Sequence, residues 1–237
     1  MSKATLERAF RRELDSRLKP LGFDRSRVPW LCGDYSRIVA GVQQILGVRI
    51  EPYLDDLEAE LVNVSVRLND VEDLVAKFEE PHPLIGPDDI AARSTLTAQF
   101  SSNKPGATDP LRGWGGESRK LWLIHSIGEM PSVASEIVAC VSNECEPTLA
   151  ALSNAERALV LLSGDDEQAR SYSGPDTARA KRSIALAFLL HGEAAAREMM
   201  KMKLARLKGE GRAEVETWAD RLFRGAGQSG ATRGGPV

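Results

Sequence analysis

The sequence has few of the residues that build metal centres and covalent cross-links. It contains 3 cysteines and 3 histidines among 237 residues. Cys140 and Cys145 are separated so that a regular α-helix would place them about 140° apart around its axis, and we do not expect them to pair or to share a metal. His82, His125 and His191 have no neighbour at the spacing of a zinc site. We therefore predict free thiols in a reducing cytoplasm, with no metal and no cofactor.

The sequence also lacks long apolar runs and a strong excess of one charge. Its longest apolar run, residues 184–190, is far shorter than the roughly 20 residues that a transmembrane helix needs. The first residues are charged and have no apolar core, unlike a secretory signal peptide. The net charge of −3 is too small to favour nucleic acid as the main partner. We expect a cytoplasmic protein that binds neither membranes nor nucleic acid.

The strongest pattern that is present is an alternation within residues 57–69. Apolar residues stand at every second position and polar residues fill the gaps: Val62, Val64, Val66 and Leu68 alternate with Asn63, Ser65 and Arg67. A period of two is that of a half-buried β-strand, and β-branched valine favours a pleated surface. The stretch predicts a strand with further strands beside it and a helix beneath it.

The segments around this strand predict the rest of the fold. An apolar stripe at spacing four predicts a helix over residues 5–19, stopped by Pro20. Further elements are expected in five segments: an edge strand in 23–31, a strand region at 34–50 with a bulge at Gly41 or Gly47, a helix at 69–78, a strand at 94–100, and at 120–126 a last strand or the lead into a helix. From Met130 onward the pattern predicts only helices. The fold class is therefore α+β: an N-terminal helix packed on an antiparallel sheet of about four strands, followed by an all-helical C-terminal half.

Turn residues and composition predict the domain organisation. Residues 1–127 form an α+β sheet domain, and residues 128–163 add helices packed on it, with a capping box at Ser153 to Glu156. Residues 164–174 are a polar linker, and residues 175–224 form a helical hairpin annex that turns at Gly192. Residues 225–237 hold five glycines without periodicity and are predicted to be a disordered tail.

Acidic residues are concentrated in one part of the chain. Residues 51–89 contain twelve acidic and two basic residues, a net charge of −10, whereas residues 177–212 contain nine basic and three acidic residues, a net charge of +6. A solvated surface is one interpretation of such a segment. The other is a recognition face for a basic protein, because carboxylates held on a rigid sheet attract and orient such a partner. The candidate partner-binding acids are Asp55, Asp56, Glu58 and Glu60.

The glycine- and proline-rich residues 101–116 predict a long loop that offers a second candidate contact. Trp114 lies in this loop between Arg112 and Arg119, and aromatic residues and arginine are enriched at interface centres. Two alternatives to a binding function stay open. One is an enzyme whose site assembles near His125, Arg119 and the 101–116 loop. The other is a helical scaffold or adaptor whose late basic helices dock a partner.

The stretch Leu18-Lys-Pro-Leu-Gly-Phe23, after an amphipathic helix, resembles the opening of the bacterial family catalogued as domain of unknown function 4304. Gln43-Gln44, Asn63 and Trp122 follow in the order expected of that family, and the resemblance covers about residues 6–162. Asp24 departs from the family's pattern, in which a base is usual. The resemblance implies a helix, an antiparallel meander and then helices, with no established activity, and some relatives are suspected to be immunity proteins that neutralise toxins. With the acidic segment, it predicts an immunity-type binding protein without catalysis.

Overall fold

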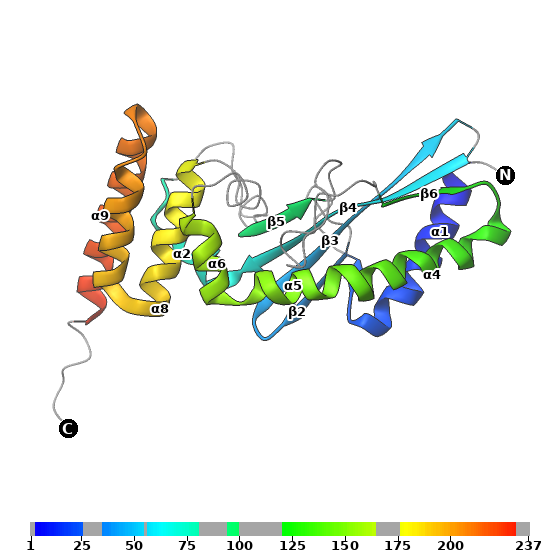
Figure 1. The fold of residues 1–237 in the computed structure, drawn as a ribbon, viewed down its shortest axis with the longest axis horizontal. Coiled ribbons are helices and arrows are strands. Elements are labelled where there is room, and N and C mark those ends of the chain that lie inside the picture. The colour runs from blue at the N-terminus through cyan, green and yellow to red at the C-terminus, as the bar shows by residue number, and fades with distance from the viewer. Residues whose placement is uncertain are drawn as a thin grey trace, which may run out of the picture. The chain divides into compact units, whose positions relative to one another are not determined.

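Two compact units make up the chain. The structure, a computed structural model, describes residues 3–25, 35–54, 56–80, 94–99, 120–164 and 176–230. The first unit is Met1–Leu68 with Ala92–Asn154, and the second is Asn69–Ala91 with Ala155–Val237. The elements are drawn in Figure 1.

The first unit combines an antiparallel sheet with helices. Its helical elements are α1 (Lys3–Leu18), η1 (Lys19–Leu21), η2 (Ile127–Glu129), α4 (Met130–Cys140), η3 (Val141–Cys145) and α5 (Glu146–Ser153). Its strands are β1 (Asp24–Arg25), β2 (Tyr35–Val39), β3 (Val42–Tyr53), β4 (Asp56–Leu68), β5 (Leu96–Gln99) and β6 (Lys120–Ile124). The predicted first helix, the strand at residues 57–69 and the strand at 94–100 are confirmed, and residues 120–126 provide a strand rather than the lead into a helix.

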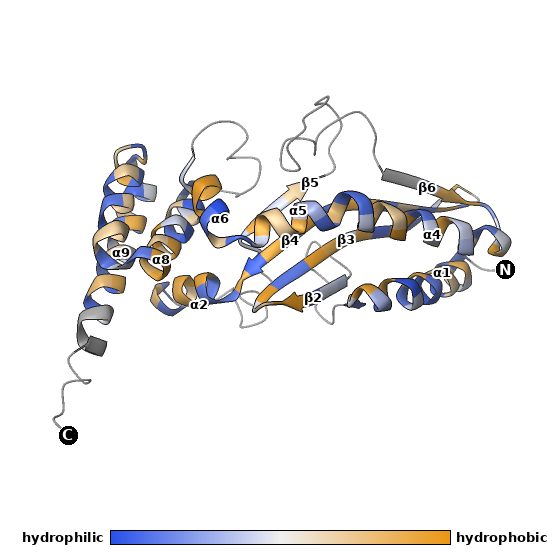
Figure 2. Cartoon of the chain, turned by 60° about the horizontal axis from the view of Figure 1, so that its bottom comes forward, coloured by the Kyte–Doolittle hydropathy of each residue, from blue (hydrophilic) through white to orange (hydrophobic). Residues whose placement is uncertain are grey.

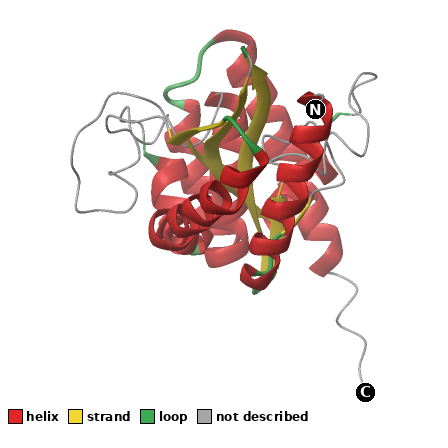
Figure 3. Ribbon diagram, turned by 90° about the vertical axis from the view of Figure 1, so that its right-hand side faces the viewer, coloured by secondary structure: helices red, strands yellow, loops and turns green. Residues whose placement is uncertain are grey.

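Strand β4 is the centre of this sheet. It pairs with β3 along its whole length on one side, and on the other side with β6 at its first half and β5 at its second half. The order is β1-β2-β3-β4-β5, with β6 also on β4, and every pairing is antiparallel. Figure 3 shows the twisted strands from the end that carries the N-terminus. The α+β class with an antiparallel sheet is thus confirmed, although the sheet has six described strands instead of about four.

The strand region predicted at residues 34–50 is wrong in one respect, because it is a hairpin of two strands. Ala40 and Gly41 form a two-residue turn between Val39 and Val42, and both have positive φ, of 49° and 81°. Two positive φ angles characterise the type I′ turn that joins twisted strands. Gly41 is therefore a turn residue, whereas the bulge predicted at Gly41 or Gly47 lies at Gly47.

The bulge changes which residues of β4 face the helices. Gly47 pairs with Asn63 but Val48 pairs with Leu61, so Val62 is an extra residue on β4. Before the bulge the odd-numbered residues of β4 are apolar and buried, and after it the even-numbered ones are: Leu57, Ala59 and Leu61, then Val64, Val66 and Leu68. Figure 2 shows apolar and polar residues along β3 and β4. The adjacent apolar pair Leu61-Val62 marks this change of phase in the sequence.

All three long helices of the first unit lie on the face of the sheet that carries these apolar residues. Tyr35 on β2 donates a hydrogen bond to Asp15 of α1 at 2.8 Å, and Gln44 on β3 donates one to Ser153 of α5 at 2.9 Å. Trp122 on β6 donates one to Glu136 of α4 at 3.0 Å. Because Tyr35, Gln44 and Trp122 pair across the strands with residues of the apolar face, the opposite face is free of these helices.

A π-helical turn joins α4 to α5 and brings two cysteines together. Cys140 and Cys145 are buried free thiols, and their mutual hydrogen bond, with burial as the second cause, raises the pKa of Cys145. A π turn contains about one more residue than an α turn, so side chains five positions apart stack on each other. The two cysteines are free thiols as expected, but the 140° separation expected for a regular α-helix does not apply in this π turn.

The second unit is helical. It contains α2 (Asn69–Phe78), α6 (Ala155–Ser163), α8 (Asp176–Leu204) and α9 (Gly209–Gly230). Gly192 interrupts α8 with φ 82° and ψ −175°, and this turn separates two arms that run in opposite directions in Figure 1. The predicted helices at 69–78 and on either side of Gly192 are confirmed.

Three boundaries differ from those expected from sequence. Helix α2 belongs to the unit of the C-terminal helices and not to the sheet domain, because its apolar side packs against α8 and α9. Ser153 is the last residue of α5, and its hydroxyl accepts the Gln44 bond instead of capping α6. Helix α9 continues through Gly230, so the predicted disordered tail begins inside a helix; residues 231–237 lie outside the described residues.

Candidate functional site: an acidic face of the sheet

Four carboxylates gather on the face of the sheet opposite the described helices α1, α4 and α5. Ahead of the bulge, the even-numbered residues of β4 point to this face, which places Asp56, Glu58 and Glu60 together. Strand β3 adds Glu51, which pairs directly with Glu58. We call Glu51, Asp56, Glu58 and Glu60 the acidic sheet face.

Among the described residues, Arg49 is the permanent cation that pairs with these carboxylates. Arg49 forms an ion pair with Glu60 and lies 3.9 Å from Glu51, measured between Nε and Oε1. The hydrogen bond to Glu60 is the main cause that raises the pKa of Arg49. Glu60 is itself only 7% exposed. Its charge holds Arg49 between the strands.

Glu51 and Glu58 lie opposite each other on adjacent strands. Like charges in this arrangement destabilise a sheet pair. Glu51 is 58% exposed, which lets water screen the repulsion. The four carboxylates and Arg49 sum to a charge of −3 when His125 is neutral. A basic side chain placed between Glu51 and Glu58 would relieve this repulsion.

The edge of the acidic sheet face carries a histidine. His125 follows β6, and its Nδ1 lies 2.9 Å from Oδ2 of Asp56. The hydrogen bond to Asp56, and then the charge of Asp56, raise the pKa of His125 above its ordinary value. The ring is 58% exposed. His125 therefore adds a positive charge to this edge at acidic pH and loses it as the pH rises.

Exposed apolar groups border the carboxylates. Leu123 pairs with Glu58 across β6 and β4 and is 38% exposed. Leu54, at the tip of the β3–β4 hairpin, is 75% exposed and has a positive φ of 46°. Protein interfaces combine apolar contact area with charged groups at the rim. The acidic sheet face has both.

The second half of the same face is polar, and its charged residue on β4, Arg67, is buried. Ser65 and Thr97 share a hydrogen bond of 2.9 Å between their hydroxyl oxygens across β4 and β5. Asn63 is buried, and its Oδ1 has no hydrogen-bond partner among the described residues. The described carboxylates of this face are therefore confined to the half of the sheet where β6 pairs with β4.

Sequence reasoning found part of this site. Asp56, Glu58 and Glu60 were candidates, and the structure brings them together. Glu51 was missed as a member, although its position two residues after Arg49 on an alternating strand is a signal for the same face. Asp55 and the loop contact of Arg112, Trp114 and Arg119 lie outside the described residues.

The features of a catalytic or metal site are not found in the part of the chain that the structure describes. A carboxylate that orients a histidine is one half of a nucleophilic site, and the other half is a hydroxyl or thiol bonded to that histidine. The side chain of His125 bonds only to Asp56 among the described residues. Nor do those residues contain three metal-ligating side chains arranged around one point.

Comparisons with known proteins give no relative for this chain. No family model, no curated protein and no solved structure matches it. Within the described ranges, no helix has the length and apolar character needed to cross a membrane.

Proposed function

We propose that this protein binds a basic protein partner through the acidic sheet face. One observation carries the proposal: Glu51 and Glu58 lie directly opposite each other on the sheet face away from the described helices of the unit, and Arg49 is the described cation that pairs with this carboxylate cluster. Monomeric proteins lose stability by such pairs, and a lysine or arginine from a partner converts the repulsion into attraction.

The arrangement favours fast and oriented association. Carboxylates on adjacent hydrogen-bonded strands are held at fixed spacing, so they attract a basic surface before contact and select its register after contact. Leu123 and Leu54 supply apolar area beside the charges, which strengthens the complex once water has left.

The proposed class of function is that of an immunity-type protein. The resemblance to the family of domain of unknown function 4304 stays a prediction, and so does the cytoplasmic setting. A toxin that acts on nucleic acid or phosphate-bearing substrates has a basic active site, and an acidic surface occludes such a site by occupying the positions of the phosphates. The same face would serve a non-toxin partner of basic surface in an adaptor.

The test compares two pairs of substitutions that remove the same charge. Glu51→Gln with Glu58→Gln changes the acidic sheet face, and Glu210→Gln with Glu216→Gln removes two exposed carboxylates of α9. The partner is recovered from the native host on the immobilised protein, purified, and its binding kinetics are measured at 0.01 M and 0.15 M salt. We expect the sheet-face variant to lower the association rate by about fivefold or more at low salt, and the α9 variant to leave it unchanged.

Salt gives a second readout of the same idea. The Debye length falls from about 30 Å at 0.01 M to about 8 Å at 0.15 M, so the association rate of the parent protein should fall steeply over this range. The rate of the sheet-face variant should fall less. A purified partner whose association ignores both the salt and the two sheet-face substitutions would rule out the proposed function.

A further inference from the structure

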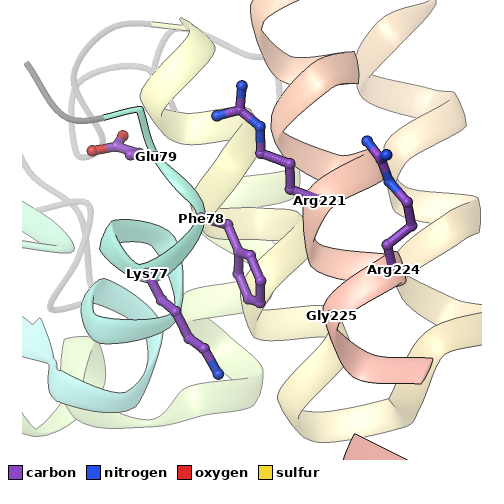
Figure 4. A pocket seen from close by; sticks show the side chains of 6 residues that line it. All are labelled: Lys77, Phe78, Glu79, Arg221, Arg224 and Gly225. Carbon is purple, nitrogen blue, oxygen red and sulfur yellow. The ribbon is translucent and has the colours of Figure 1, made fainter. Parts of the chain in front are cut away.

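A second charged feature, of opposite sign, lies in the helical unit. Helices α2 and α9 border an open groove of about 500 Å³. Its lining is Lys77 and Phe78 of α2, Glu79 just after it, and Arg221, Arg224 and Gly225 of α9 (Figure 4). Three of these six residues are cationic, and one is acidic.

The groove is part of a well-packed contact between the two helices. Trp218 of α9 donates a buried hydrogen bond of 3.0 Å to the carbonyl oxygen of Val75 in α2. About two turns further along α9, Gly225 meets the ring of Phe78 so closely that an added Cβ would lie 2.7 Å from Cε1. The two contacts fix α9 against α2 at both sides of the groove, so its cations project from a defined surface.

Three carboxylates in and just after α2 form ion pairs within the unit. Glu72 pairs with Arg182 at 2.8 Å and Glu79 pairs with Lys181 at 3.2 Å. Glu80 pairs with Arg221 and is mostly exposed. Once these pairs have formed, the groove has fewer unpaired carboxylates than cations.

Two groove cations have no carboxylate within ion-pair distance in the described chain. The ammonium of Lys77 lies 5.3 Å from the centre of the Phe78 ring, and Arg224 donates only to the backbone oxygen of Asp220, at 3.2 Å. Figure 4 shows the ammonium of Lys77 on the opposite side of the Phe78 ring from the guanidinium groups of Arg221 and Arg224. The cations are therefore spread along the groove around an aromatic floor.

We infer that this groove binds an acidic peptide segment of a partner protein. Carboxylates on either side of an apolar residue match the spacing of the groove, since the apolar side chain rests on Phe78 while the acids reach Lys77 at one end and Arg224 at the other. A single phosphate group is too small to contact cations that point to opposite ends. The site is separate from the acidic sheet face and does not depend on the proposed function.

The experiment uses the full chain and a fluorescein-labelled peptide of sequence Gly-Glu-Glu-Leu-Glu-Glu-Gly, with binding followed by fluorescence anisotropy. The groove variant is Lys77→Gln with Arg224→Gln. The matched control, Lys201→Gln with Lys208→Gln, removes two exposed cations of the same unit. We expect the groove variant to weaken peptide binding roughly tenfold and the control to change it less than about twofold. Circular dichroism confirms that each variant keeps its helices.

Three outcomes overturn the inference. An equal loss in both variants would show unspecific attraction to a basic surface. A second is that a peptide with Gln in place of each Glu binds equally well, or that the acidic peptide does not bind measurably. Either result would show that the groove does not recognise the carboxylates of a peptide. Displacement of the peptide by inorganic pyrophosphate at an equal concentration would identify a small-anion site and not a peptide groove.

Discussion

The acidic residues of the two units lie in opposite environments. In the sheet unit Glu51 and Glu58 face each other at the surface, and Arg49 is the described cation that pairs with their cluster. In the helical unit Glu72 is 1% exposed and is bonded to Arg182 through two nitrogen atoms. The acidic run of residues 51–89 is thus divided: its first part stays charged toward solvent, whereas Glu72, Glu79 and Glu80 pair with cations of α8 and α9.

The reason for the difference lies in the geometry of each element. A strand places alternate residues on opposite faces, so the acids of β3 and β4 gather on the side that the apolar core does not use. An amphipathic helix packed between others on several sides has no such free face, and a carboxylate on it must find a cation or accept a large desolvation cost. The same reasoning applies to Lys203, whose ammonium donates to the carbonyl oxygens of Leu162 and Ser163 and whose pKa is lowered to about 8 by burial.

The largest expected effect comes from a carboxylate placed in the core of the sheet unit. Val64 is fully buried on the helix side of β4. Val64→Asp puts an unpaired charge there and should lower the free energy of unfolding by about 4 kcal/mol or more. Urea denaturation followed by far-ultraviolet circular dichroism measures the loss. A variant that unfolds at the same urea concentration as the parent would contradict the assignment of β4.

The contrast between the two units is tested most directly by Glu72→Gln. Breaking a buried ion pair leaves Arg182 charged and uncompensated, so the cost should be about 3 kcal/mol. Glu58→Gln removes the same charge in the sheet unit and should change stability by less than about 0.5 kcal/mol, or raise it, because it relieves repulsion from Glu51. Equal losses of unfolding free energy for Glu72→Gln and Glu58→Gln would show that the two units do not differ in how they hold their carboxylates.

A smaller effect is expected where α9 touches α2. Gly225→Ala adds a methyl group at 2.7 Å from Phe78, and overpacking of this kind costs about 1–2 kcal/mol even though alanine favours a helix. Gly128→Ala in the sheet unit meets only the Ser126 hydroxyl at 3.8 Å and should change stability by less than about 0.5 kcal/mol. Thermal unfolding of both variants separates the two cases. No loss for Gly225→Ala would show that α9 does not rest on Phe78.

The smallest expected effect is the titration of His125. Because its folded pKa is raised, its contact with Asp56 stabilises the protein fully below the ordinary value of about 6.5, and the contribution disappears as the pH rises through the folded pKa. Two-dimensional NMR of the imidazole should give a pKa above 6.5 that returns toward 6.5 in Asp56→Asn. A His125 pKa that Asp56→Asn leaves unchanged would show that the pair does not form in solution.

The sequence predicted the class of the fold and its central strand because both depend on periodicity. The hairpin at Ala40-Gly41 was missed because its first turn residue is alanine, which lacks the usual asparagine or aspartate signal for a positive φ. The contact of Cys140 with Cys145 was missed because no local pattern announces a π turn. In the candidate site, strand alternation grouped Asp56, Glu58 and Glu60, but the Arg49–Glu60 pair follows from the register between β3 and β4. The register is set by long-range packing and cannot be predicted from the sequence of either strand alone.

The extra residue Val62 has a practical consequence for anyone who edits or transplants this strand. Before Val62 the odd-numbered side chains of β4 point toward the helices, and after it the even-numbered ones do. A single odd-or-even rule for inward and outward positions therefore fails along β4. Moving the carboxylates of the acidic sheet face onto a regular hairpin, with Val62 removed, would keep their spacing but turn either them or Asn63 and Ser65 toward the helices. Conversely, deletion of Val62 in this chain would force one half of β4 to present its polar side chains to the core. The bulge lets a single strand follow two apolar patterns of opposite phase. A transplanted version of the acidic sheet face must therefore include the bulge.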